Sequence, residues 1–410
     1  MLAACSSRPA SPPPVAPDQR DECRLSGDSA ASLDTFTVAL TDPVEWARVS
    51  SPANDSERLL FRQLFETLVR IDCRGEIRPG IADGWSSDST GRFWTFTFPQ
   101  PGQFTGHPPI TAGAVASSWK AREPGIQTLG IDSAVALDDR TLRVTLRASR
   151  DSAPRLFADP LLSVGHRVAV VHDPSGRVVV PNDPPVDFEL SPAGDPRDAL
   201  DRGIDLVVTR DPAVAEYVAS RPEFVTFPLP WSRTYALLQF AGTQPISGIP
   251  GTDSLRRSLA SDVVEAEARP AQPPFWWNGP QSCRLDVLME VTLPTSPRVV
   301  YSRTDEIARA LAERIVALSG NTQLRAVGLG DIDFATALRE GGERGYIVFL
   351  PRNVAAPCHA SAALSAGGWL EPLIDTRARA IVRRGAPPLS IDWDGSIKVV
   401  GKEERSRGSQ

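Results

Sequence analysis

The sequence lacks long hydrophobic runs. No stretch of the 410 residues approaches the ~20 consecutive apolar residues of a membrane-spanning helix. It also lacks a basic surplus, because 50 Asp and Glu outnumber 44 Lys and Arg and the formal net charge is -6. Nucleic-acid binding needs a basic stripe, so we expect no nucleic-acid partner. With 41 % hydrophobic and 23 % charged residues, the composition is that of a globular protein with a large core.

The usual motifs of catalytic and metal sites are missing as well. Gly328 and Gly330 are not followed by the third glycine of a phosphate-binding loop, and no GxSxG nucleophile elbow is present. The four histidines are scattered, and no two cysteines have the CxxC spacing of zinc or redox sites. We therefore expect no catalytic residues, no metal site and no cofactor, and a hydrolase is the least favoured class.

The clearest pattern lies in residues 57–119. Apolar side chains recur at three- and four-residue spacing from Leu60 to Leu68, which predicts an amphipathic helix. Residues 93–98 (FWTFTF) alternate and predict a strand with aromatic side chains on one face. Thr111 is well placed to cap a further helix that runs to Trp119.

Local patterns in the rest of the chain predict a mixture of strands and helices. Residues 33–40 alternate as in a strand, and residues 130–146 predict a hairpin. Residues 305–318 carry one apolar stripe and form the best predicted helix, between strands at 284–291 and 324–329. A short helix at 334–338 and a strand at 346–350 follow. Alternation of strands and helices in this order indicates an α/β fold.

Five motifs in residues 57–119 resemble, in order and spacing, the signature of the family 5 extracytoplasmic solute-binding proteins. This family comprises the peptide- and nickel-binding proteins of ABC importers. The matching residues are Glu66 to Arg70, Pro79 to Ala82 with Trp85, Trp94 to Phe98, Phe104 to Gly106 with Pro108, and Thr111-Ala112 with Val115. The resemblance covers most of residues 33–400 but has two departures. Residues 164–187 lack two family motifs, and only residues 352–368 stand where a long ligand-binding segment normally lies.

This resemblance implies an α/β fold of the class II periplasmic-binding-protein type, with two lobes joined by hinge strands. We expect lobe I to comprise residues 24–230 plus 368–403, and lobe II residues 236–355. Residues 404–410 would form a disordered tail.

Residues 1–22 resemble the remnant of a lipoprotein signal followed by a tether. Small residues precede Cys5, as in signals whose cysteine is lipidated, and a stretch rich in Ser, Pro and Ala follows. We therefore expect lipidation at Cys5, a lipid anchor in the membrane, and a location on the periplasmic or cell-surface side. The alternative is a chance LAAC sequence at a cytosolic start.

Four further cysteines suggest two disulfides in an oxidising compartment. Cys23, Cys73, Cys283 and Cys358 allow three connectivities. We favour Cys23–Cys73 and Cys283–Cys358, because we assign each pair to one lobe. Four buried thiols are the alternative.

A binding protein of this kind needs aromatic faces beside its ligand cleft. The candidates are Trp231 and Tyr235 on the strand that leaves lobe I, Trp276 and Trp277 after a Pro-rich loop, and Tyr346 on the returning strand. Each has an alternative interpretation as a core aromatic. The Asp with which peptide-binding members anchor the ligand's α-amino group has no match here.

The resemblance implies a monomeric substrate-binding component that delivers a small ligand to an ABC permease, by family default an oligopeptide. Lobe closure would bind the ligand without bond chemistry. The alternative is a decayed family member that no longer transports and acts as an envelope interaction or sensor lipoprotein.

Overall fold

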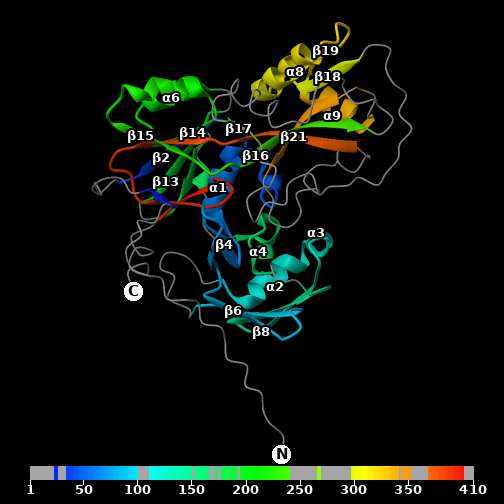
Figure 1. Cartoon of the computed structure of the whole chain (residues 1–410). Coiled ribbons are helices and arrows are strands. Elements are labelled where there is room, and N and C mark those ends of the chain that lie inside the picture. The colour runs from blue at the N-terminus through cyan, green and yellow to red at the C-terminus, as the bar shows by residue number, and fades with distance from the viewer. Residues whose placement is uncertain are drawn as a thin grey trace, which may run out of the picture. The chain divides into compact units, whose positions relative to one another are not determined.

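The computed structural model describes most of the chain (Figure 1). The described residues are 23–25, 34–99, 110–149, 153–165, 171–172, 177–182, 184–191, 194–240, 266–268, 297–340, 343, 345–351 and 368–400. Cys5, Trp276, Trp277, Cys283 and Cys358 lie outside them, as do the expected tether, tail and strand at 284–291. Within these ranges, no helix is both long enough and apolar enough to cross a membrane.

The chain forms two compact units. One comprises Met1–Val208, Glu223–Val225 and Ile381–Gln410, and the other comprises Thr209–Pro222 and Thr226–Ala380. The lobe boundaries given above stay a prediction.

A seven-stranded sheet provides much of the core of the first unit. Its order is β11 (Val171–His172), β12 (Arg177–Val180), β13 (Val186–Leu190), β2 (Phe36–Leu40), β14 (Leu206–Thr209), β22 (Arg379–Arg383) and β15 (Phe224–Pro228). β2 runs parallel to both β13 and β14, and its residues Phe36 and Leu40 are completely buried. The alternation of residues 33–40 therefore correctly predicted a strand. α5 (Pro196–Asp201) precedes β14, and α6 (Pro212–Ala219) belongs to the second unit.

A four-stranded antiparallel sheet with the order β6-β7-β9-β8 carries the aromatic motif. Its strands are β6 (Gly84–Ser87), β7 (Phe93–Thr97), β8 (Ile131–Asp138) and β9 (Thr141–Leu146). Trp94 and Phe96 on β7 are buried, as the alternation predicted. α2 (Ala112–Lys120) begins at the predicted cap, where the Thr111 hydroxyl accepts a hydrogen bond from the Ala114 N–H, and α3 (Glu123–Thr128) follows.

α1 (Asp55–Leu64) is shorter than the apolar spacing predicted. The Asn54 side chain caps its start, accepting from the Glu57 N–H at 2.8 Å. The helix ends at Leu64 because Phe65 turns extended and enters β3 (Phe65–Glu66), which pairs with β10 (Val164–Gly165). Leu68 lies after the end of the helix but is also buried, and this is why the apolar spacing continues beyond Leu64 in the sequence.

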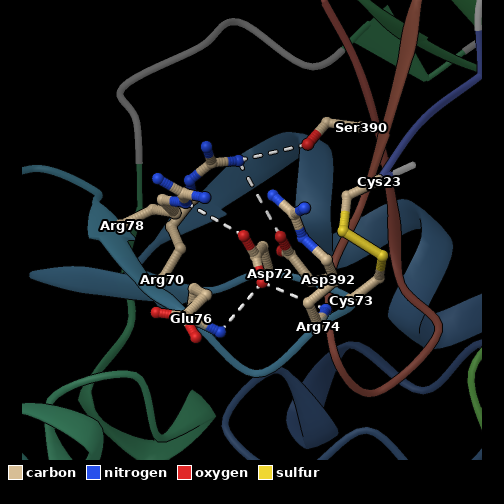
Figure 2. The surroundings of a disulfide bond; sticks show 9 residues. All are labelled: Cys23, Arg70, Asp72, Cys73, Arg74, Glu76, Arg78, Ser390 and Asp392. Atoms are coloured by element: carbon tan, nitrogen blue, oxygen red, sulfur yellow. Dashed lines mark hydrogen bonds and ion pairs between the residues drawn. A yellow bond between two sulfur atoms is a disulfide. The ribbon is translucent and has the colours of Figure 1, made fainter. Parts of the chain in front are cut away.

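Several short elements surround α1. They are β1 (Arg24–Leu25), η1 (Trp46–Arg48), β4 (Val69–Ile71), β5 (Ile77–Pro79), α4 (Ala153–Leu156), η2 (Pro160–Leu162), β23 (Leu389–Ile391) and β24 (Ile397–Val399). β1, β23 and β24 form one sheet, and β4 pairs with β5. The predicted Cys23–Cys73 disulfide is present, with 5.4 Å between the Cα atoms, and it joins β1 to the turn after β4 (Figure 2).

The second unit is built on a six-stranded sheet. Its order is β17 (Ala266–Ala268), β21 (Gly368–Thr376), β16 (Arg233–Phe240), β20 (Gly345–Pro351), β18 (Arg298–Ser302) and β19 (Arg325–Leu329). α8 (Glu306–Ser319) packs on it through Leu311 and Ile315, close to the predicted bounds. Gly320 ends α8 in the left-handed conformation (φ 64°), which favours glycine. α9 (Asp331–Glu340) is longer than the predicted helix at 334–338.

Candidate functional site

A hollow of about 70 Å³ lies within the first unit, beside α1. Its walls come from α1, from β3 and β4, from the segment around η2, and from the turn between β23 and β24. The lining residues are Val49, Pro52, Arg58, Phe61, Arg62, Phe65, Glu66, Thr67, Arg70, Ile71, Ala158, Pro160, Ser163, Asp392, Trp393, Asp394 and Ser396. Eight of these residues are apolar and nine are polar, six of them charged. Apolar walls with convergent polar groups are typical of small-molecule sites.

Arg62 is the central charged group of this hollow. Its side chain is 9 % exposed, and its Nη1 donates to the Glu66 carboxylate at 2.9 Å. Its Nε donates to the carboxylate of Asp392, which lies 330 residues further along the chain. Two carboxylates thus hold the guanidinium from two sides, as expected of a buried cation.

Two more cations contact the same carboxylates. Lys398 on β24 places its Nζ 3.1 Å from Glu66 Oε2. Arg70 on β4 places its Nη1 3.8 Å from Asp392 Oδ1 and donates to the Ser390 hydroxyl at 3.3 Å (Figure 2). The network therefore contains three cations and two carboxylates.

Burial and charge pairing have opposite effects on the pKa of Arg62. Burial by itself disfavours the Arg62 charge, but the Asp392 and Glu66 carboxylates outweigh it and raise the pKa of Arg62. Arg62 is therefore charged at every ordinary pH.

Two buried polar atoms of the lining have no hydrogen-bond partner among the residues that the structure describes. They are the second terminal nitrogen of Arg62, Nη2, and the hydroxyl oxygen of Ser163. A buried donor without an acceptor lowers stability, by about 1–3 kcal/mol for an ordinary group. Both atoms are buried, and both belong to residues that line the hollow.

The disulfide fixes the turn beside this network. Figure 2 shows Asp72, next to Cys73, accepting hydrogen bonds from the backbone N–H groups of Arg74 (3.0 Å) and Glu76 (2.9 Å). Its second oxygen accepts from Arg78 Nε at 2.9 Å. Asp72 also forms an isolated antiparallel bridge with Asp392, which links this turn to the hollow.

Tyr235 and Tyr346, predicted as ligand contacts, lie in the core of the second unit. Tyr235 is 1 % exposed, and its hydroxyl donates to the carboxylate of Asp305, with oxygen–oxygen distances of 2.9 and 3.1 Å. Tyr346 is 0 % exposed, and its hydroxyl donates to the Ala337 carbonyl at 2.8 Å. Burial raises the pKa of Tyr346 to about 12. The two rings belong to separate core clusters, so the fold does not bring them together.

Trp231 is partly exposed, and the Arg377 guanidinium lies 4.4 Å from its ring centroid. A cation over an indole face is a favourable contact. The role of these aromatic residues in ligand binding stays a prediction.

Sequence reasoning did not find the network, although one local signal was present. Arg62 and Glu66 are four residues apart, a spacing at which opposite charges meet on a helix. Nothing local indicated Asp392 or Ser163. In the part of the chain that the structure describes, no group of three or more His, Cys, Asp and Glu side chains is placed to hold a metal ion.

Comparison with known proteins gives short matches in sequence. No family profile matches the chain. The periplasmic murein peptide-binding protein MppA of Escherichia coli is 39 % identical over 61 residues, which are 15 % of this chain and 11 % of MppA. A Haemophilus influenzae protein described as a binding protein is 24 % identical over 130 residues, which are 26 % of this chain and 24 % of that protein. The chain thus matches less than a quarter of the length of these relatives.

Solved structures match over most of the chain. NikA from Brucella suis, in complex with Fe(III)-EDTA, superposes with a TM-score of 0.64 at 13 % identity, covering 89 % of this chain and 100 % of NikA. The Escherichia coli murein tripeptide binding protein MppA gives a TM-score of 0.59 at 14 % identity, covering 87 % and 95 %. At such low identity, these likenesses establish the fold.

Proposed function

We propose that this chain, which has the α/β fold of the two-lobed periplasmic binding proteins, is the extracytoplasmic substrate-binding component of an ABC importer. The observation that carries this proposal is the likeness in fold, which spans 87–89 % of the chain for both MppA and NikA. The five ordered motifs of residues 57–119 support it independently, because they were identified without the structure.

The proposed ligand is a small molecule, and an oligopeptide is the first class to test. MppA, named for murein peptide binding, matches this chain in both sequence and fold. NikA, by contrast, is described in complex with Fe(III)-EDTA. In the proposed mechanism, a monomer closes its two lobes on the ligand, and no covalent bond is made or broken.

The proposed location is outside the cytoplasm, with a lipid anchor at Cys5. The Cys23–Cys73 disulfide supports a location outside the cytoplasm, because disulfides persist in oxidising compartments and are rare in the cytosol. An ABC permease would be the partner.

A decayed protein without transport function is the less favoured proposal. The short segment 352–368 motivated it, but the likeness in fold extends over 95 % of MppA and 100 % of NikA. The chain therefore retains a fold comparable to that of these binding proteins over nearly their whole length.

Native mass spectrometry of gently purified protein, followed by thermal shift with short peptides, tests the proposal. A ligand in hundredfold excess over its Kd stabilises the folded state by about 2.7 kcal/mol. We expect a co-purified mass, or a rise in Tm with some peptides and not with others. Protein that is empty and insensitive to every peptide and small-molecule ligand tried contradicts the proposal.

Trp231→Ala tests the proposed aromatic contact in the same assay. We expect it to reduce the ligand-induced shift while the Tm without ligand changes little, because the Trp231 ring is partly exposed. Trp85→Ala, a partly exposed tryptophan on β6, is the matched control and should leave the shift intact. A large fall in Tm with an unchanged shift would place Trp231 in the core instead.

A further inference from the structure

The Cys23–Cys73 disulfide closes a ring of bonds around the backbone of Asp392. The Cys23 carbonyl accepts a hydrogen bond at 2.8 Å from the N–H of Ile391, the residue before Asp392. On the other side, Asp72, the residue before Cys73, forms the backbone bridge with Asp392. The disulfide joins these two sides and so completes the ring (Figure 2).

This ring holds one end of a wall of the hollow. The Asp392 carboxylate accepts from Arg62 Nε and lies 3.8 Å from Arg70 Nη1. Asp392 also begins the turn of residues 392–396, four of which line the hollow. The ring therefore fixes both the start of this turn and the carboxylate that Arg62 contacts.

The other end of the turn has an anchor that contains no sulfur. Gln63, a buried residue of α1, donates from Nε2 to the Ile397 carbonyl. Its Oε1 accepts from the Val399 N–H at 3.0 Å. Both partners lie on β24, which follows the turn. Of these two anchors, the ring is the one that reduction opens.

The two cysteines of the disulfide differ in exposure. Cys23 is 3 % exposed, whereas Cys73 is partly exposed and is followed by the exposed Arg74. Thiol–disulfide exchange depends on access of the attacking thiolate to a sulfur atom. We therefore expect a thiolate to attack Cys73 Sγ.

The turn that carries Cys73 has hydrogen bonds of its own. The Asp72 carboxylate accepts from three donors of residues 74–78, at 2.9 to 3.0 Å. β1, by contrast, is two residues long and pairs with β23. Because short elements with few hydrogen bonds open locally at low cost, cleavage of the disulfide should loosen the Cys23 side of the ring and leave the turn in shape.

We propose that the Cys23–Cys73 disulfide is a redox-sensitive clamp on this wall of the hollow, which a dithiol opens without unfolding the first unit. With the ring open, the turn of residues 392–396 keeps its anchor at Gln63, but Asp392 loses its fixed position against Arg62. The clamp lies within one unit and does not depend on the transport function proposed above.

The dithiol supplies both electrons for this step. One of its thiolates bonds to Cys73 Sγ, the bond between the two cysteines breaks, and Cys23 leaves as a thiolate that takes up a proton. The second thiol of the reagent then attacks the mixed disulfide and releases Cys73, which takes up the proton that this thiol loses. The dithiol ends as a disulfide, and Cys23 and Cys73 end as thiols.

NMR spectra of the full chain before and after addition of dithiothreitol test the clamp. The reporter is the Arg62 Nε–H signal, which is assigned by its loss in Arg62→Lys. The controls are the Val399 N–H and the indole N–H of the buried Trp119, which donates to the Leu162 carbonyl at 2.9 Å. We expect dithiothreitol to shift or remove the Arg62 signal and to leave both control signals in place.

A variant with Cys23→Ala and Cys73→Ala separates this pair from the other cysteines of the chain. The variant should show the altered Arg62 signal both with and without dithiothreitol, because its ring is always open. If dithiothreitol instead changes the Arg62 signal equally in the variant and in the wild type, the change comes from another cysteine and the proposal is overturned.

Three further results would overturn the proposal. They are a Cys23–Cys73 bond that resists dithiothreitol in the folded protein, an unchanged Arg62 signal after complete reduction, and loss of the control signals together with that of Arg62. The last result would mean that reduction unfolds the unit. Alkylation followed by mass spectrometry shows which cysteines are reduced.

If the variant does not fold, a reduction time course of the wild type decides. The Arg62 signal should then change in step with alkylation of Cys23 and Cys73. A change in step with Cys283 and Cys358 would contradict the clamp.

Discussion

Asp159 is a buried carboxyl next to the hollow, between the lining residues Ala158 and Pro160. It is buried, and its Oδ1 accepts from the Leu161 N–H at 2.9 Å at the start of η2. Burial raises the pKa of Asp159 to about 6, although the Leu161 N–H opposes that rise. A carboxyl with a raised pKa makes the folded state take up a proton at mildly acidic pH.

Asp159→Asn should therefore change how stability depends on pH. The folded state binds the Asp159 proton more tightly than the unfolded chain, so this contribution is fully present below about pH 4. It is lost as the pH rises to about 6. Between pH 4 and 7.5, the wild type should lose about 3 kcal/mol of unfolding free energy relative to Asp159→Asn. Urea unfolding of both proteins at the two pH values measures this.

Asp195→Asn is the control for that experiment. Hydrogen bonds from Arg197 lower the pKa of Asp195, so its contribution is present at neutral pH and is lost as the pH falls. Between pH 4 and 7.5 the Asp195→Asn profile should therefore stay close to that of the wild type, and it should deviate in the opposite direction only below about pH 4. Parallel profiles for wild type and Asp159→Asn would contradict the assigned burial of Asp159.

At the scale of elements, α8 shows how one side chain serves both a helix and the core. Asp305 caps the helix by accepting from the Ala308 N–H at 2.9 Å, and it also accepts from the buried Tyr235 hydroxyl. An N-cap contributes about 1 kcal/mol, and a buried hydroxyl left without a partner costs about 1–3 kcal/mol.

Asp305→Ala should therefore lower the free energy of unfolding by about 2–4 kcal/mol. Tyr235→Phe should cost about 1 kcal/mol, and the double variant should lose less than the sum, with a coupling of about 1 kcal/mol. Denaturant unfolding of the four proteins gives this cycle. Asp211→Ala is the matched control, because Asp211 caps α6 through Ala213 and should cost only about 1 kcal/mol. If the losses of unfolding free energy in the two single variants simply add in the double variant, the hydrogen bond between Asp305 and Tyr235 contributes nothing to stability.

At the scale of the whole molecule, the Cys23–Cys73 disulfide ties the start of the described chain to the turn beside the hollow. The two cysteines are 50 residues apart, and β1 would otherwise be held by its pairing with β23. Closing a loop of this length in the unfolded chain stabilises the folded state by about 4 kcal/mol on entropic grounds, and measured values are often lower.

Replacing both cysteines (Cys23→Ala with Cys73→Ala) should lower the free energy of unfolding of the first unit by about 2–4 kcal/mol. Hydrogen exchange should accelerate in β1, β4 and β23 and change little in β16 and β20 of the second unit. Substitution is preferred to reduction, because it leaves Cys283 and Cys358 untouched. Unchanged protection of β1 and β23 would contradict this role of the disulfide.

The sequence by itself determined the features that depend on neighbours along the chain. Alternation of apolar and polar residues predicted the strands β2 and β7. The capping residue Thr111 predicted the start of α2, and a single apolar stripe predicted α8. The order of five motifs indicated the α/β fold of a two-lobed binding protein, which the solved structures confirm.

Only the tertiary structure decided what depends on residues far apart in the chain. α1 ends at Leu64 because Phe65 and Glu66 pair with a strand about 100 residues later. The spacing of apolar residues carries no information about such a long-range contact. Arg62 meets Asp392 across 330 positions because β23 and β24 bring the turn of residues 392–396 beside α1. The burial of Tyr235 likewise follows from sheet packing. The local sequence around an aromatic residue is the same whether its ring lies in a core or in a binding site.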